Sequence, residues 1–163
     1  MFTVGIIVSS DKGSKGERED LSGKLIKEKM EQTGYKVIDY IIVPDEKIQL
    51  EEAMIEMCDK KKIDLILTSG GTGFSKRDVT PEATMNVVER QTPGISEAIR
   101  YYSLQITPKA MLSRAVSGIR KNSLIINLPG SPKAVEETIE FLLPVLEHGL
   151  EILKGLASEC ARK

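Results

Sequence analysis

The sequence contains few cysteines and histidines. Only two cysteines, Cys58 and Cys160, occur among 163 residues, and they do not form a CxxC pair. This spacing favours reduced thiols that serve packing over a disulfide framework or a zinc site. The single histidine, His148, argues against mechanisms that need a histidine pair, a His–Asp relay or several histidines on a metal. We therefore expect any chemistry to depend on carboxylates, backbone amides, hydroxyls and cations.

The chain also lacks an excess of either charge and any long apolar run. It has 23 basic and 24 acidic residues, so its net charge of −1 offers no attraction for nucleic acid. Apolar residues make up 40% and charged residues 29%, which favours a soluble folded protein over a disordered or membrane-spanning one. The first residues have no basic leader before their apolar stretch, which predicts a strand, not a signal peptide, and a cytoplasmic location.

Alternating strand and helix patterns predict the fold of the first half. Three Val- and Ile-rich runs, Phe2–Ser9, Val37–Val43 and Ile63–Thr68, have the near-continuous apolarity of buried parallel strands. Helical patterns at Asp20–Gln32 and Glu46–Lys60 separate these runs. The sequence therefore predicts a three-layer, doubly wound α/β fold with right-handed crossovers.

The second half predicts two helices and an antiparallel hairpin. Cap-plus-proline patterns start helices expected at Thr80–Glu89 and at Pro93 to about Leu104. Strands are expected at Ala115–Arg120 and Ser123–Leu128, joined by a tight Lys121-Asn122 turn. The sheet is therefore expected to be mostly parallel with a short antiparallel hairpin.

One long helix is expected to close the chain. It begins at Ser131-Pro132, and we predict a kink or break at Pro144 because proline removes a helical hydrogen bond. We find no internal repeat, low-complexity segment or linker, so residues 1–163 are expected to form a single domain.

A glycine-dense loop between a buried strand and a capped helix is the strongest local signal. Residues 68–82 contain Gly70, Gly71 and Gly73, and a helix is expected to start at Pro81. Such glycines let backbone N–H groups approach an anion, and the helix dipole favours one. The alternative is that the glycines only form a tight turn; three in four positions, with hydroxyls and a carboxylate nearby, favour a ligand loop. Neither a Walker A pattern nor a dinucleotide fingerprint occurs, which argues against a P-loop ATPase and an NAD enzyme.

Two aspartates follow predicted strands. Asp78 lies in the glycine loop and Asp45 follows the second strand, so both are expected at the same sheet edge. Together they could hold Mg²⁺ on phosphate oxygens. The competing interpretation of Asp45 is an N-cap of the next helix, and that of Asp78 is a solvated loop residue.

Two further loops are expected at this edge. Residues 9–16, which include Asp11, follow the first strand, and residues 127–133 follow the last. Gly130 and Ser131 could cradle a third anion, with Lys133 to balance its charge; the alternative is an ordinary capped helix start. Glu97 and Arg100 lie one helical turn apart, and their spacing alone indicates a solvated surface pair.

Five ordered segments carry a resemblance to a known family: Ser10–Gly23, Thr68–Thr84, Pro93–Arg100, Leu112–Arg120 and Leu124–Ala134. Together they resemble the Mog-type molybdopterin-binding family over nearly the whole chain. Ser69 stands where many relatives have threonine and Lys76 where many have proline, and neither change removes a carboxylate or a glycine.

The resemblance implies an α/β homotrimer that transfers the adenylyl group of ATP to the phosphate of molybdopterin with Mg²⁺. A hand-over of the product to a molybdenum-inserting protein would follow. The family's paired catalytic, metal-binding aspartates fall on Asp45 and Asp78. The expected ligand-binding residues are Asp11, Gly70, Gly71, Thr72, Gly73, Ser75, Glu97, Arg100, Ser113, Arg114, Gly130, Ser131, Pro132 and Lys133.

Two alternatives to this activity remain at the level of sequence. One is a related protein that binds molybdopterin with weak or absent transferase activity, although the Arg77–Glu82 motif favours the active branch. The other is a different phosphate-handling α/β enzyme.

Overall fold

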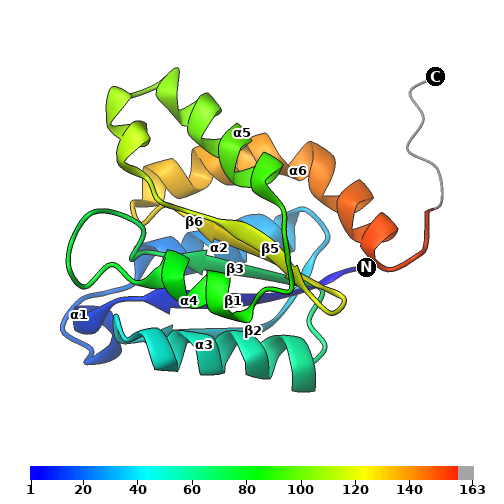
Figure 1. Ribbon diagram of the computed structural model, residues 1–163, viewed down its shortest axis with the longest axis horizontal. Helices are drawn as coiled ribbons and strands as arrows, with labels where there is room; N and C mark the ends of the chain where they lie inside the picture. Colours follow the sequence, from blue (N-terminus) through cyan, green and yellow to red (C-terminus); the bar gives the residue numbers. More distant parts are fainter. Residues whose placement is uncertain (158–163) are drawn as a thin grey trace.

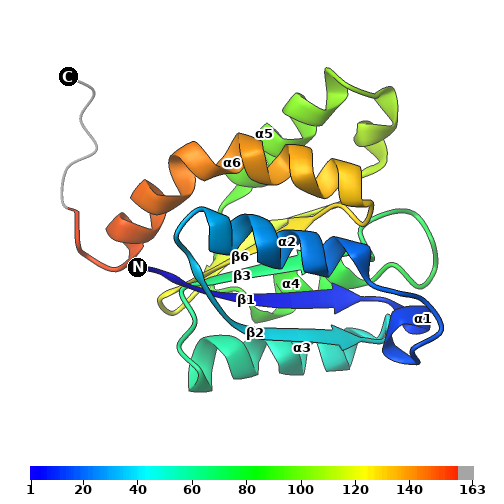
Figure 2. The same cartoon turned by 180° about the vertical axis from the view of Figure 1, so that it is seen from behind.

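The computed structural model describes residues 1–157, which form one six-stranded sheet between two helical layers (Figures 1 and 2). The strand order is β2-β1-β3-β6-β5-β4. Strands β2, β1, β3 and β6 are parallel, while β5 is antiparallel to β6 and β4 to β5. The strands are β1 (Thr3–Ser9), β2 (Lys36–Val43), β3 (Leu65–Ser69), β4 (Arg90–Gln91), β5 (Ser117–Arg120) and β6 (Ser123–Leu128).

The helices divide between the two faces of the sheet. α2 (Leu21–Gln32), α5 (Pro93–Leu104) and α6 (Pro132–Leu153) cover one face, and α3 (Lys47–Ile55) and α4 (Thr80–Val87) cover the other. Three short elements complete the list: α1 (Asp11–Ser14), the π-helical turn η1 (Glu56–Lys60) that continues α3, and the 3₁₀ helix η2 (Pro108–Leu112). No described helix is long and apolar enough to cross a bilayer.

Apolar side chains that point alternately to the two faces of the sheet form two cores. In β1, Ile6 packs with α2 and α6, whereas its neighbour Ile7 packs with α3 and α4. The same alternation places Leu65 and Ile66 of β3 on opposite faces. Because successive side chains of a strand point to opposite faces, continuous apolar runs serve a sheet that is covered on both sides.

The predicted fold class is confirmed, with differences at element ends. The helix expected to reach Glu89 ends at Val87, because Val88 is extended and the Glu89 N–H donates to the carbonyl of Ile119. This bond leads into β4, a two-residue strand that the sequence did not indicate. Of the kink or break predicted at Pro144, the break is wrong, since α6 runs through this residue. Pro144 and Glu140 are both exposed, so water can bind the carbonyl that the proline leaves free.

The parallel strands all end at one edge of the sheet, on the left in Figure 1. β1 ends at Ser9, β2 at Val43, β3 at Ser69 and β6 at Leu128. The outer strand β2 also carries an irregularity, because its register with β1 shifts between Val4 and Gly5. The loops that follow these four strand ends therefore meet, as expected from the sequence.

Candidate functional site

The glycine loop after β3 turns sharply against β1. Gly70 has φ +90° and Gly71 has φ +68°, a region that favours glycine. A Cβ at Gly70 would lie 2.5 Å from the carbonyl oxygen of Ser9, and one at Gly71 would lie 2.4 Å from the Thr80 Oγ1. The tight turn therefore accounts for these two glycines, whatever else the loop binds. Gly73 differs, since its Cβ would approach only the Asp78 carboxylate, at 3.0 Å.

Asp78 closes the second half of this loop. Its Oδ2 accepts a hydrogen bond from the Ser75 N–H at 3.0 Å, and its own N–H donates to the Ser75 carbonyl at 3.0 Å. The side chain is therefore not merely solvated. It is half-buried, and its carboxylate keeps further lone pairs for a ligand.

Arg114 holds the same loop from outside. Its guanidinium donates to the carbonyl oxygens of Gly73 and Asp78, each at 2.7 Å, and pairs with Glu82 of α4. Its backbone N–H donates to the carbonyl of Thr72 at 2.9 Å. All three guanidinium nitrogens contact protein atoms, so the structure favours a positioning role for Arg114 over direct contact with a ligand.

Asp45 joins the loops after β1 and β2. Its carboxylate accepts from the Ser9 hydroxyl at 2.6 Å and from the Asp11 N–H at 2.9 Å, while the Asp11 carboxylate accepts from the Asp45 N–H at 3.0 Å. The competing N-cap interpretation of Asp45 is wrong, because Glu46 occupies the cap position of α3 and makes no side-chain cap bond.

Arg77 connects this aspartate pair to the glycine loop. It donates to both oxygens of Asp11, at 2.9 and 3.0 Å, and to Glu46 at 2.8 Å. The Arg77 guanidinium holds the pKa of Asp11 below its usual value. Since Arg77 immediately precedes Asp78, the two predicted catalytic aspartates lie in loops that are tied together at one sheet edge. Sequence reasoning missed Arg77 as a contact, although its motif contains it.

A first pocket of about 390 Å³ lies among these loops. Of the predicted ligand-binding residues, Gly70, Gly130 and Pro132 line it. Ser9 also lines it, and this residue connects the pocket to Asp45. Ser10, from the predicted 9–16 loop, lines it too, and further lining residues that were not singled out from the sequence are Arg18, Glu19, Asp20 and Ser22. Arg18 to Ser22 lie in the segment after the first strand that carried the family resemblance, which was the available signal.

Two serines fix the wall of this pocket. The Ser22 hydroxyl donates to the carbonyl of Gly130 at 2.7 Å, and the Ser69 hydroxyl donates to that of Pro129 at 2.8 Å. Ser131 is the N-cap of α6, and its Oγ accepts from the Ala134 N–H at 3.3 Å. Lys133 is exposed in the first turn of the same helix. The capped helix start is thus present beside the pocket.

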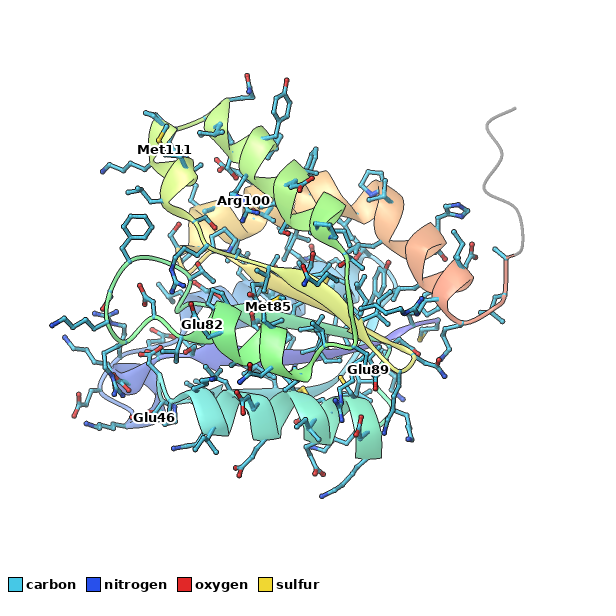
Figure 3. All side chains as sticks on the ribbon, in the orientation of Figure 1. Glu46, Glu82, Met85, Glu89, Arg100 and Met111 are labelled. Atoms are coloured by element: carbon cyan, nitrogen blue, oxygen red, sulfur yellow. The ribbon has the colours of Figure 1, made fainter. Side chains whose placement is uncertain are left out.

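A second pocket, of about 230 Å³, adjoins the first because Gly130 lines both. Three more of the predicted ligand-binding residues, Thr72, Arg100 and Ser113, line it. Arg100 donates to the carbonyl of Ala115 at 2.6 Å, so it does not form the expected surface pair. Glu97 is exposed, and within residues 1–157 no ion pair joins it to Arg100. Figure 3 shows Arg100, Glu82 and Glu46 along the side of the molecule that carries these loops.

Several predicted residues line neither pocket. These are Asp11, Asp45, Gly71, Gly73, Ser75, Asp78, Glu97, Arg114, Ser131 and Lys133. Within the described chain, no group of three or more acidic, histidine or cysteine side chains could hold a metal ion. Any divalent ion here would therefore need oxygens from a bound substrate as well as from the aspartates.

Comparisons with known proteins agree with this architecture. A family model described as a probable molybdopterin binding domain matches residues 5–148. A molybdopterin adenylyltransferase of Helicobacter pylori (strain J99) is 44% identical over 154 residues, which cover 93% of this chain and 88% of the relative. One from Escherichia coli (strain K12) is 40% identical over 139 residues, covering 84% and 71%. The crystal structure of the molybdopterin biosynthesis enzyme MoaB from Thermus thermophilus superposes with a TM-score of 0.90 at 46% identity, covering 95% and 98%.

Proposed function

The chain belongs to the family of molybdopterin-binding domains, and we propose that it transfers the adenylyl group of ATP to the phosphate of molybdopterin in molybdenum cofactor biosynthesis. In this reaction an oxygen of the pterin phosphate forms a bond to the α-phosphorus of ATP. The bond from that phosphorus to the β-phosphate oxygen breaks, and pyrophosphate leaves. No protein nucleophile is needed.

One observation supports this function best: the two pockets lie side by side, because Gly130 lines both of them. Two phosphate-bearing substrates can occupy neighbouring pockets, so that their phosphates approach each other near the shared wall. Catalysis then follows from positioning, which removes the entropic cost of bringing two substrates together, and from fixed dipoles around the phosphates.

The two aspartates have different supporting contacts in this proposal. Asp45 organises the loops after β1 and β2, through Ser9 and Asp11. Asp78 closes the glycine loop and keeps free lone pairs. Mg²⁺ commonly binds one or two carboxylates together with substrate phosphates. In this proposal Asp45 and Asp78 would hold such an ion, which would neutralise charge on the triphosphate.

Asp78→Asn tests the proposal. The amide oxygen can still accept from the Ser75 N–H, so the loop should keep its shape while the charge is lost. With ATP, Mg²⁺ and molybdopterin, we expect formation of the adenylylated pterin to fall about 100-fold or more, with an unchanged unfolding temperature. Asp39→Asn is the matched control. Asp39 lies on the outer strand β2, away from the two pockets, and its carboxylate pairs with Lys61. Full activity of Asp78→Asn would remove this residue from the mechanism.

The second candidate function is a non-catalytic molybdopterin carrier. The family assignment supports it equally, because the matching family model is described by binding alone. A carrier would bind molybdopterin and leave ATP intact. A turnover assay on the wild-type chain, which follows pyrophosphate release, separates the two.

The remaining expectations are part of the proposal. We expect a single-domain cytoplasmic homotrimer that passes its product to a molybdenum-inserting protein. Light scattering that shows a monomer at micromolar concentration would contradict the trimer. Loss of activity on chelation of Mg²⁺, with recovery when the ion is restored, would support the metal dependence.

A further inference from the structure

A third cavity, of about 290 Å³, lies at the opposite edge of the sheet from the two pockets. It lies where β3 and β6 begin, beside the β5–β6 turn at the right of Figure 1. Its walls include three lysines, Lys62, Lys121 and Lys154, together with Asp64 and Cys58. We call this cavity the lysine pocket. A strand of five residues such as β3 separates it from the catalytic edge by roughly 17 Å.

The lysine pocket has an excess of positive charge. Lys154 pairs with Asp64, and Lys121 lies 2.8 Å from Asp59. Lys62 makes no ion pair or hydrogen bond with any described residue.

Charges just outside the lining do not remove the excess. Arg120 pairs with Asp59 at 2.7 Å, and the Glu89 carboxylate accepts from the Lys121 N–H at 2.9 Å. Glu89 is labelled at this end of the molecule in Figure 3. Within residues 1–157, Arg120 and the three lysines outnumber the carboxylates Asp59, Asp64 and Glu89 by one positive charge.

Backbone strain falls on two of the same lysines. Lys62 has φ +54° and Lys121 has φ +51°, and no other non-glycine residue of the described chain has a positive φ. Glycine would adopt these conformations without the steric cost that a Cβ brings. Strain of this kind tends to collect at ligand sites, where the side chain is needed despite its cost. Both strained residues line the cavity.

We propose that the lysine pocket binds a small phosphate-type oxyanion, at a site separate from the catalytic pockets. Lys62 supplies the unpaired charge, and Lys121 and Lys154 frame the anion on either side. Cys58 contributes a neutral wall: it is only 2% exposed, and burial raises the pKa of its thiol to about 11. This inference does not depend on the proposed transferase activity.

Inorganic phosphate is the probe for the test. The ¹⁵N-labelled full chain is titrated with phosphate at constant ionic strength, and the amide signals of Asn122 and Ser123 are followed. These amides lie by the lysine pocket, so phosphate bound at the catalytic edge does not report there. We expect the chemical shifts of these amides to change saturably with phosphate. Lys62→Gln should raise the apparent Kd at least tenfold, as expected for the loss of a charge-assisted hydrogen bond.

Two further variants make the test sharp. Lys62→Gly should weaken phosphate binding equally and yet raise the unfolding temperature, because glycine relieves the positive φ. Lys60→Gln, which removes a lysine paired with Glu56 outside the cavity, should leave binding unchanged. Shifts that grow linearly, or that chloride reproduces, or a Kd unaffected by Lys62→Gln, would overturn the proposal.

Discussion

Arg114→Lys is the most informative single change at the sheet edge that carries the two pockets. The guanidinium donates to the carbonyls of Gly73 and Asp78 and also pairs with Glu82. Lysine keeps the positive charge but loses the planar fork that reaches several acceptors at once. We therefore expect the substituted side chain to retain one of these contacts, and the loop that carries Asp78 to lose its fixed position.

The magnitude follows from the two lost carbonyl contacts. The Arg114 side chain is 32% exposed, so each bond contributes about 1 kcal/mol net. A total of about 2 kcal/mol corresponds to a roughly 30-fold lower ratio of ordered to open loop. We expect amide exchange in residues 72–78 to accelerate about 30-fold, and kcat/KM for adenylyl transfer to fall measurably, by up to the same factor.

Arg120→Lys is the matched control. Arg120 makes a comparable set of bonds, to the Asp59 carboxylate and to the carbonyl of Val87, but at the far edge of the sheet. It should lower stability by a similar amount and leave kcat/KM unchanged. Wild-type activity in Arg114→Lys would refute the reasoning, as would an equal loss of kcat/KM in both variants.

Three further predictions concern backbone, pH and thiol chemistry. Gly71→Ala should lower the unfolding temperature because of its positive φ and the 2.4 Å approach of its Cβ to a hydroxyl, whereas Gly130→Ala, which meets other atoms only at 3.5 Å, should not. Hydrogen bonds from Arg120 and Lys121 hold the pKa of Asp59 well below its usual value. The Asp59 carboxylate therefore stabilises the fold above about pH 4, and this stabilisation is lost as the pH falls further. Urea unfolding of Asp59→Asn should accordingly depend less on pH in the acid range than that of the wild type. Burial raises the pKa of Cys58 from 9.0 to about 11, so in a Cys160→Ser background iodoacetamide should react roughly 100-fold more slowly with native than with unfolded protein at pH 8.

The sequence predicted the parts of the fold that local patterns determine. Val- and Ile-rich runs located the parallel strands, and cap-plus-proline patterns located the starts of α4, α5 and α6. The glycine loop and Asp78 were found because unusual residue types gather within a few positions. A strand as short as β4 has no pattern of its own, since its two residues pair only because β5 lies beside them.

The contacts within the site were harder to predict because they join distant segments. Asp45 resembles an N-cap in sequence, and only the approach of Ser9 and Asp11 across 34 to 36 residues shows its different role. Two of the three partners of the Arg114 side chain are carbonyl groups, which leave no trace in residue identity. The shared wall at Gly130 likewise depends on how two loops pack in space.

The two outer strands determine how copies of this chain can associate. β4 has only two residues, both exposed, and the opposite outer strand β2 contains a register shift, so neither offers a long regular ladder to a neighbouring molecule. Sheets from separate molecules therefore have little opportunity to fuse edge to edge. Any assembly of this protein should form through its helices and loops, and the isolated chain should resist fibril formation even when concentrated.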